Sequence, residues 1–391
     1  MLALVATMTS VCFYFQVHQP YRIRRYSFFE KGVSSRYFDE KLNREVMSRV
    51  AERCYIPANR ALLRAIQRTE GRIRVAFSIT GTALSQMRDY APEALESFRE
   101  LARTGCVEFL GETYHHSLAA LHDEGEFRAQ VEMHRDLLRG EFGVTPTIFR
   151  NTELIYSDRI GELIAGLGYS GVLAEGVPDV LGWRTAHSTY NLPGSSLRII
   201  PKSSTLSDDI AFRFPSGGSS GGPLTVERFI ERLRVAADDD GVVGLFMDYE
   251  TFGEHHSAES GILAFLESLP EAIIRMPGWE VLSPTHVVQR SSSQGDLSYP
   301  RETSWADEAR DISAWCGNSM QRSALEKVYA YAPKTEALKE LWRRLQTSDH
   351  FYYMSTKSGA DGQVHSYFSP FESPYEAFIS YINVLSDLTA R

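Results

Sequence analysis

The sequence predicts an α/β fold built around a parallel sheet or barrel, and three observations lead to this expectation. Short apolar runs of strand length recur along the first 256 residues. Segments with the apolar spacing of amphipathic helices alternate with these runs, which is the order that parallel strands require. Several runs end abruptly in histidine or carboxylate side chains with an aromatic residue beside them. Such side chains, at the carboxyl ends of parallel strands, would meet at one edge of the sheet or barrel.

The expected elements begin with a strand over the apolar run Val11–Val17. A helix with one apolar face follows at Glu45–Arg68, and Pro57 is expected to interrupt it because proline lacks a backbone N–H. The next strand is Arg72–Ile79, and the next helix is Pro92–Thr104. Together these segments make the first two strand-helix units.

The same alternation continues through the middle of the chain. In order, the expected elements are a strand at Cys106–Leu110, a helix at Phe127–Arg139 ending at Gly140, a strand at Thr147–Phe149, a helix at Asp158–Leu167, and strands at Gly171–Ala174 and Val242–Met247. The last strand follows a glycine-rich start and is apolar throughout, as a strand buried on both faces would be. The glycine- and serine-rich stretch Pro215–Pro223 is expected to be a surface loop that could act as a lid.

The carboxyl-terminal part of the chain is expected to be helical. The polar stretch Ser291–Gly295 marks the predicted boundary, and helical patterns follow at Ser319–Tyr331 and Thr335–Gln346. With 391 residues, two domains are the natural expectation. We therefore predict a catalytic α/β domain over 1–290 and an α-helical domain over 298–391 that contributes to the cleft.

Four predicted strand ends carry polar side chains with aromatic neighbours. They are the segments that begin at His18, Glu112, Arg150 and Asp248. A solvated surface loop is the simpler explanation for any one of them. In the last segment, however, Tyr249 and Phe252 are interleaved with carboxylates, which a surface loop does not need. The four together indicate strands that converge on one polar pocket.

Arg150 and Glu153 form a pair that suits nucleophilic catalysis. A cation near a carboxylate keeps the carboxylate ionised at neutral pH, and a nucleophile must be ionised. An ordinary salt bridge at a strand end explains the same pair equally well.

In this order, the segments HQPYR, GETYHHS, FRNTEL and MDYETFGEH resemble the conserved regions of glycoside hydrolase family 57, and most of all its α-amylase-like branch. The resemblance continues through Trp183, Leu206–Phe214 and Thr347–Tyr353, so it covers nearly the whole chain. It implies an incomplete (β/α)7 barrel followed by an α-helical domain, and an enzyme that acts on α-1,4-linked glucans with retention. It further implies that Glu153 is the nucleophile and Asp248 is the general acid/base.

The implied chemistry agrees with the residues. Retention needs two carboxyl groups roughly 5–5.5 Å apart, one ionised and one able to donate a proton. Burial behind an apolar strand and the nearby Glu250 would raise the pKa of Asp248, while Arg150 would hold Glu153 ionised.

Further side chains are expected to contact the substrate through planar polar groups or aromatic faces. They are His18, Gln19, His115, Arg150, Trp183, Glu250, His255, Trp315, Asp349 and His350. Trp315 could instead belong to the core, and His18 could be a hydrogen-bonded histidine at a strand end. The adjacent pairs His115–His116 and His255–His256 could suggest a metal, but adjacent histidines rarely bind one ion together. We therefore expect neither a metal nor another cofactor.

Three classes of function remain open from the sequence. The first is an α-glucan hydrolase of the amylase type, and the second is a 4-α-glucanotransferase or another α-glucan transferase that uses the same carboxylates. The third is a metal-dependent polysaccharide deacetylase or a glucan-binding protein without catalysis. The expected partner is an α-glucan or maltooligosaccharide.

Composition limits the classes of binding partner and the cellular compartments that we expect. A net charge of −9 disfavours nucleic acid, and no apolar run approaches the length of a membrane span. Cys12 and Cys106 fall in predicted buried strands, so free thiols and a cytoplasmic location are expected. The first residues lack the basic start of a signal peptide and lead directly into the His18 segment. Met8 could be the true start in place of Met1.

Overall fold

A computed structural model of the chain describes residues 8–216, 224–237 and 240–391. Most of the predicted lid loop, from residue 217 to 223, lies outside the described residues, as does the segment that bears on the choice between Met1 and Met8.

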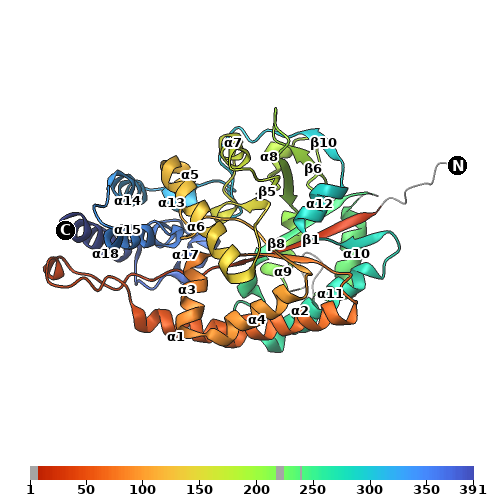
Figure 1. Cartoon of the computed structure of the whole chain (residues 1–391), viewed down its shortest axis with the longest axis horizontal. Coiled ribbons are helices and arrows are strands. Elements are labelled where there is room, and N and C mark those ends of the chain that lie inside the picture. Colours follow the sequence, from red (N-terminus) through yellow and green to blue (C-terminus); the bar gives the residue numbers. More distant parts are fainter. Residues whose placement is uncertain (1–7, 217–223, 238–239) are drawn as a thin grey trace.

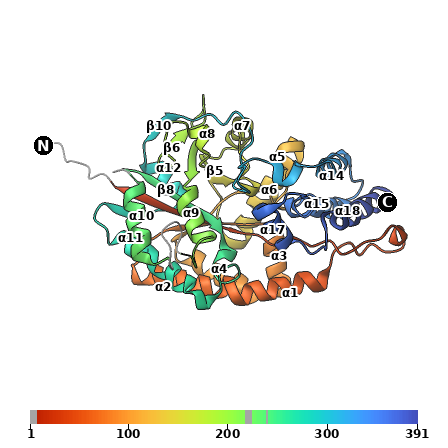
Figure 2. The same ribbon diagram turned by 180° about the vertical axis from the view of Figure 1, so that it is seen from behind.

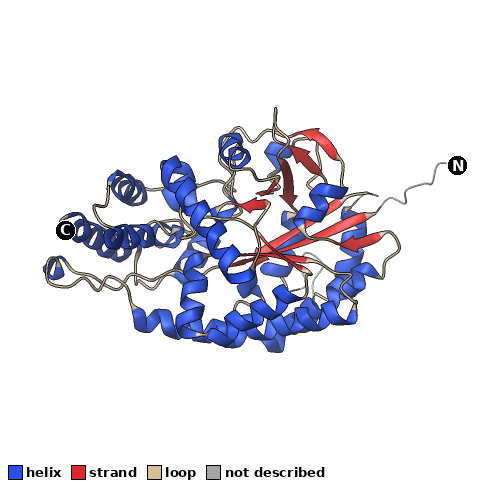
Figure 3. Cartoon of the chain, in the orientation of Figure 1, coloured by secondary structure: helices blue, strands red, loops and turns tan. Residues whose placement is uncertain are grey.

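The strands form one mixed sheet whose central part is a parallel barrel (Figure 3). The described strands are β1 (Thr9–Val17), β2 (Val75–Ile79), β3 (Val107–Phe109), β4 (Ile148–Arg150), β5 (Gly171–Glu175), β6 (Thr189–Asn191), β7 (Arg198–Lys202), β8 (Val242–Asp248), β9 (Trp279–Val281) and β10 (Ser293–Asp296). Seven of them run parallel in the order β3, β2, β1, β8, β7, β5, β4. β9 is parallel to the start of β1, β6 is antiparallel to β7, and β10 is parallel to β6.

The barrel closes through two narrow seams. Gly111, two residues beyond β3, is the bridge to β4, where the Arg150 amide donates to the Gly111 carbonyl oxygen at 2.8 Å. β7 and β8 pair only at Lys202 and Gly244. A side chain at Gly244 would collide with the Pro201 carbonyl oxygen, so glycine permits this close approach. The predicted incomplete (β/α)7 barrel is confirmed by this topology.

Helices cover the outside of the barrel and form the carboxyl-terminal region (Figure 1). They are α1 (Glu40–Val50), α2 (Ile56–Arg68), α3 (Gly81–Tyr90), α4 (Pro92–Arg103), α5 (Ala119–His122), α6 (Glu124–Phe142), α7 (Asp158–Gly166), α8 (Pro178–Leu181), α9 (Ser204–Ala211), α10 (Val226–Ala236), α11 (Ile262–Ile274), α12 (Pro284–Arg290), α13 (Ser313–Cys316), α14 (Ser319–Ala330), α15 (Glu336–Leu345), α16 (Ser348–Tyr352), α17 (Gly359–Phe368) and α18 (Pro374–Thr389).

The helical segment predicted over residues 45–68 is interrupted near Pro57, as expected: it consists of two helices, α1 and α2, joined by a π-helical turn at Ala51–Tyr55. It begins earlier than predicted, at Glu40. The wider turn accommodates the proline at the start of α2, where its missing N–H costs nothing. The helix predicted to end at Gly140 continues to Phe142 and ends at Gly143, which has the left-handed φ of 70°. The helix ends at the glycine that adopts the left-handed conformation, whereas Gly140 lies inside the helix.

The helical region packs directly on the barrel. A single hydrophobic cluster contains Phe149 and Val172 from barrel strands together with Trp315, Leu325 and Val384 from the carboxyl-terminal helices. In Figures 1 and 2 these blue helices gather at one end of the molecule, beside the red loop that precedes α1. β10 lies within the stretch that was predicted to separate two domains, and it pairs with β6. The division into 1–290 and 298–391 stays a prediction.

The four cysteines are free thiols, and Cys12, Cys54 and Cys106 are buried. Free buried thiols were the expectation for Cys12 and Cys106. Across residues 8–216, 224–237 and 240–391, no helix combines the length and the apolar character needed to cross a bilayer.

Candidate active site

The carboxyl ends of four barrel strands bring polar side chains together. His18 follows β1, Glu112 and His116 follow β3, Glu153 follows β4, and Asp248 ends β8. β1 and β8 are paired in register, with Gln16 opposite Asp248. Because the seven strands are parallel, these side chains occupy the same end of the barrel.

Glu153 lies in a short 3-10 turn, Thr152–Leu154, directly after β4. Its φ of 56° and the φ of 51° at Leu154 are left-handed conformations that disfavour residues with large side chains. Backbone strain of this kind gathers at functional sites, where surrounding contacts maintain it.

The Glu153 carboxylate accepts hydrogen bonds from three donors. Ser348 Oγ, at the start of α16, bonds to Oε1 at 3.2 Å, and His116 Nε2 bonds to the same oxygen at 3.3 Å. Trp305 Nε1 donates to Oε2 at 2.8 Å. Donors on both oxygens hold the carboxylate in one orientation, and two of the three come from the carboxyl-terminal region.

His116 lies between two carboxylates. Its Nδ1 bonds to Glu112 Oε2 at 3.2 Å, and its ring stacks on the His18 ring with 4.1 Å between centroids. Burial alone lowers the pKa of His116, but the hydrogen bonds to Glu112 and Glu153 outweigh it and raise that pKa to about 9. His116 is therefore an imidazolium at neutral pH, and both ring nitrogens donate.

This imidazolium keeps Glu153 ionised. Burial raises the pKa of the carboxyl, but the His116 hydrogen bond and charge, followed by the Arg150 charge, bring it below its usual range. From the sequence we expected Arg150 to keep Glu153 ionised. The structure corrects this, because His116 is in direct contact with Glu153 and lowers its pKa more than Arg150 does. Among the described residues, Arg150 forms no ion pair with Glu153. Its buried guanidinium lies 4.5 Å from the Trp305 ring centroid.

The pKa of Asp248 moves in the opposite direction. Burial is the main cause, the negative charge of Glu153 adds to it, and together they raise the pKa of Asp248 to about 7. The like charge that raises it is thus Glu153 rather than the expected Glu250. Asp248 keeps a proton near neutral pH while Glu153 does not.

Glu250 is a second carboxyl with a raised pKa. Its Oε1 accepts from the Tyr55 hydroxyl and from Gln19 Nε2, the latter at 3.3 Å. Burial and the Asp248 charge raise the pKa of Glu250 to about 8. Gln19 in turn accepts from Arg22 Nη2 at 2.8 Å, so Gln19 and Glu250 share one hydrogen-bond network.

Asp349 of α16 contacts His18 across the site, with Nε2 donating to Oδ2 at 3.0 Å. The Thr80 hydroxyl bonds to His18 Nδ1 at 2.9 Å. Burial and the neighbouring positive His116 lower the pKa of His18, so the ring is neutral. Burial raises the pKa of Asp349, but the contact with His18 lowers that pKa by a larger amount. The carboxylate therefore stays ionised.

The remaining predicted side chains lie outside this cluster. His115 is buried beside Tyr114, and His350 is buried with Nε2 on the Arg344 carbonyl oxygen at 3.1 Å. His255 is on the turn after β8, where its ring lies 5.5 Å from Phe368. Trp183 is 87% exposed and carries Arg184 over its ring, whereas Trp315 is 1% exposed and packs in the helical core.

Sequence reasoning missed four side chains that the structure brings to Glu153, directly or through His116: Glu112, His116, Trp305 and Ser348. The GETYHHS segment held a signal for two of them, because it ends a strand with a carboxylate four residues before a histidine. We chose His115 instead of its neighbour. At His116 a φ of 52° turns the chain, so only the second of the two rings enters the site.

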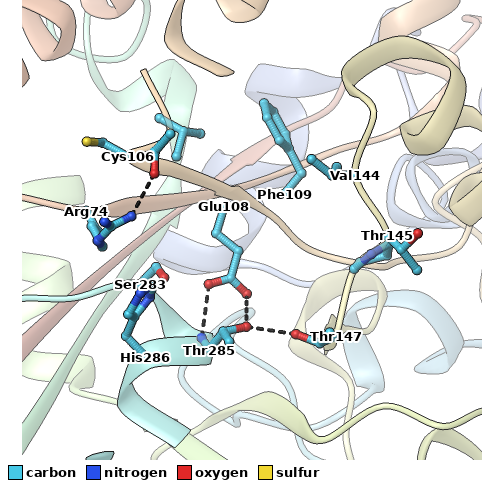
Figure 4. A pocket seen from close by; sticks show the side chains of 13 residues that line it. Arg74, Cys106, Glu108, Phe109, Val144, Thr145, Thr147, Ser283, Thr285 and His286 are labelled. Carbon is cyan, nitrogen blue, oxygen red and sulfur yellow. Dashed lines mark hydrogen bonds between the residues drawn. The ribbon is translucent and has the colours of Figure 1, made fainter. Parts of the chain in front are cut away.

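A hollow of about 250 Å³ lies at the opposite end of the barrel (Figure 4). It is next to the start of β3 and the residue before β4, Thr147. Its Glu108 carboxylate accepts from the Thr285 hydroxyl at 2.7 Å and from the Thr285 amide at 3.0 Å, and Thr147 bonds to the same hydroxyl. These polar groups satisfy one another, and sites of parallel barrels form at the carboxyl ends of strands. We assign this hollow no role in the chemistry.

Within the described ranges, no three His, Cys, Asp or Glu side chains are grouped so that they could hold a metal ion. The expectation that the protein needs no metal stays a prediction, which metal analysis of the purified protein can test.

Comparisons with known proteins identify the family to which the chain belongs. The family model "Glycosyl hydrolase family 57" matches residues 12–300. A Methanocaldococcus jannaschii protein named "Putative alpha-amylase" is 39% identical over 96% of this chain and 83% of its own length.

Two solved structures share the fold. A family 57 branching enzyme of Thermococcus kodakaraensis is 15% identical, with a TM-score of 0.65 over 92% of this chain and 87% of its own. The 4-alpha-glucanotransferase of Thermococcus litoralis is 16% identical, with a TM-score of 0.60 over 96% of this chain. This chain spans 55% of that larger protein. The matched family model and the archaeal relative show that the chain belongs to glycosyl hydrolase family 57 and is a glycoside hydrolase.

Proposed function

We propose that the protein hydrolyses α-1,4-linked glucans with retention, as an enzyme of the α-amylase type, with Glu153 as nucleophile and Asp248 as general acid/base. One observation carries the proposal. Two carboxyl groups at the same end of the barrel have pKa values displaced in opposite directions, with Glu153 low and Asp248 about 7. Such a pair provides an ionised carboxylate for nucleophilic attack and a protonated carboxyl group as acid at the same pH.

In the first step, an oxygen of ionised Glu153 attacks the anomeric carbon while Asp248 gives its proton to the departing glycosidic oxygen. The C–O bond to the leaving sugar breaks, and a glycosyl ester on Glu153 forms. In the second step, Asp248 takes a proton from water, whose oxygen attacks the same carbon and releases Glu153. Two inversions restore the original anomeric configuration.

The surrounding residues support this division of roles. His116, Ser348 and Trp305 donate to Glu153 and fix its orientation for attack. When Glu153 becomes an ester and loses its charge, the pKa of Asp248 falls, because the negative charge that raised it has gone. Asp248 is then the base that the second step needs.

The substrate class rests on the relatives. The archaeal relative carries the name of an alpha-amylase, and the two solved structures are a branching enzyme and a 4-alpha-glucanotransferase. We infer an α-glucan or maltooligosaccharide as substrate. His18, Gln19, Arg150, Glu250 and Asp349 are the proposed sugar-binding groups, because they border the carboxyl pair. His115, Trp183, His255, Trp315 and His350 are left out of this set.

Product analysis on maltooligosaccharides, amylose and pullulan tests the proposal. Hydrolysis yields short products whose new reducing ends are α-anomers when first formed, as nuclear magnetic resonance can observe. Products longer than the substrate would assign the same two carboxyl groups to a transferase. First-formed β-anomers, or no action on any α-glucan, would contradict the proposal.

A further inference from the structure

Four charged side chains form a buried cluster that the proposed reaction does not use. Lys202, at the end of β7, lies 3.3 Å from Glu175 Oε2 and 3.0 Å from Asp208 Oδ1. Arg310, from the segment before α13, reaches Asp208 Oδ2 at 2.8 Å and Glu175 Oε2 at 3.7 Å. The side chains of Glu175 and Lys202 are fully or almost fully buried, and those of Asp208 and Arg310 are mostly buried. Two positive and two negative charges therefore balance at the carboxyl ends of β5 and β7.

Burying four charges is expensive even when they are paired, and apolar packing would join two elements at lower cost. Such a cluster is therefore better explained by a need to hold side chains in a fixed orientation than by a contribution to stability. Arg310, the most exposed of the four side chains, also makes a contact outside the cluster: its Nη1 donates to the backbone carbonyl oxygen of Trp305. Trp305 is the residue whose indole N–H bonds to Glu153.

The segment from Ser304 to Arg310, here called the Trp305 loop, is a closed turn. The Ser304 amide donates to the Arg310 carbonyl oxygen at 3.1 Å, which joins its two ends. Asp307 and Arg310 have left-handed φ values of 56° and 49°, which external contacts must maintain in residues with side chains. The loop therefore depends on its anchors for its shape.

The Trp305 loop is anchored on both sides. Arg310 ties it to the barrel through the charge cluster. On the other side, Asp307 accepts from Lys357 Nζ at 2.6 Å and from His365 Nε2 at 3.1 Å. The His365 ring in turn stacks on Tyr352, with 3.6 Å between centroids. The loop is thus clamped between the barrel and the helical region.

We propose that Arg310 is a positioning residue for the reaction, and that through Trp305 it directs Glu153 toward the substrate. The inference rests on the proposed role of Glu153 as nucleophile. With the carbonyl of Trp305 held by Arg310, the indole N–H meets Glu153 Oε2 at 2.8 Å, and the indole ring covers the Arg150 guanidinium. Release of the carbonyl would let both contacts drift. Small displacements of a reacting group are enough to slow catalysis severely.

The competing explanation is that the cluster only fastens the helical region to the barrel. In that case the loss of Arg310 would lower thermal stability without a specific effect on Glu153. The two explanations differ in whether Arg310 and Trp305 act on one quantity, the turnover step, and a double-mutant cycle measures such coupling.

The test uses the full chain and compares Arg310→Met, Trp305→Phe and the double variant. Trp305→Phe keeps an aromatic ring but removes the N–H donor. We expect each single variant to lower kcat about 10- to 100-fold at nearly constant KM, as loss of a hydrogen bond to a reacting group does. The double variant should be no slower than the worse single variant. The acidic limb of the kcat/KM profile should move to higher pH in both single variants, because Glu153 loses a donor to its ionised form.

Arg301→Met is the matched control, since Arg301 lies in the same part of the chain and pairs with exposed Asp179 at 2.8 Å. It should leave kcat and the pH profile unchanged. If Arg310→Met does not fold, Asp208→Asn, which keeps the volume and weakens the hold on Arg310, takes its place in the cycle.

Multiplicative losses in the double variant, or an Arg310 variant with wild-type kcat and only a lower Tm, would overturn the positioning role. Neither result would contradict the proposed function, which fails only if the wild-type enzyme itself does not cleave α-glucans with retention.

Discussion

His116 joins Glu153 to Glu112 through a single imidazolium ring, with ring nitrogens 3.3 Å and 3.2 Å from the two carboxylates. The ring also stacks on His18, so the cation is held from three sides. This arrangement stabilises a negative charge on Glu153 within a buried site, where burial by itself raises the pKa of a carboxyl group. In the proposed mechanism, this contact keeps Glu153 ionised for attack and leaves the role of proton donor to Asp248.

Replacing His116 with asparagine should lower kcat/KM at least tenfold at neutral pH, since a charged hydrogen bond of this kind contributes about 1.5–3 kcal/mol. His116 lowers the pKa of Glu153, so its loss must raise that pKa and move the acidic limb of the pH profile upward. His115→Asn is the matched control, because its ring is one position away and outside the site. Equal kinetic effects of the two substitutions would contradict the role of His116.

The kcat/KM of the wild-type enzyme should depend on pH in a bell-shaped manner, with its two limbs determined by the pKa values of two carboxyl groups. Asp248 must carry a proton for the first step, and its pKa is about 7, so activity should be lost as the pH rises through about 7. Glu153 must be ionised, and although burial raises its pKa, the contact with His116 brings that pKa below the usual range, so activity should be lost on the acidic side only at lower pH than for an ordinary glutamate. A measured kcat/KM profile with no decline between pH 6 and 9 would contradict the assignment of Asp248.

Asp248→Asn should abolish cleavage of ordinary glucans while largely preserving the first step on glycosyl fluorides. Fluoride leaves without protonation, so that step does not need the acid. Comparison of single-turnover rates on the two kinds of substrate measures the difference. Glu250→Gln is the paired variant, since Glu250 also has a raised pKa. If it, rather than Asp248→Asn, shows the selective loss, Glu250 is the acid.

The carboxyl-terminal region should contain both catalytic contacts and plain packing. Asp349→Asn weakens the contact with His18 and should lower kcat with little change in Tm. Trp315→Ala removes a buried aromatic side chain and should cost about 3–5 kcal/mol of unfolding free energy while kcat of the folded enzyme is retained. Thermal unfolding and steady-state kinetics on the two variants separate these effects. The reverse pattern would mean that the roles of Asp349 and Trp315 are exchanged.

Local patterns predicted six of the seven parallel strands, whereas β7 was not predicted and the barrel itself was implied by the resemblance to family 57. The apolar run before Asp248 and the amphipathic pattern after Glu153 identify elements without any knowledge of their neighbours. Helix ends were less secure, as Gly140 shows, because a glycine terminates a helix only where the backbone turns left-handed.

The site was predictable only where strand ends carry it. His18, Glu153 and Asp248 follow or end strands, so topology alone gathers them. Trp305 lies 152 residues from Glu153 and comes from a loop without a regular pattern, so its contact depends on how the helical region docks. Trp305 was not considered from the sequence, and Trp315, which was expected either to contact the substrate or to belong to the core, is 1% exposed.

The most direct measurement is mass spectrometry of the Asp248→Asn variant after incubation with an α-glycosyl fluoride. The first step proceeds without the acid, and the second is slow without the base, so the glycosyl-enzyme should accumulate. Peptide mapping should place one glycosyl group on Glu153, and the Glu153→Gln, Asp248→Asn double variant should carry none. An adduct on any other carboxylate, or no adduct despite release of fluoride, would contradict the assignment of Glu153 as the nucleophile.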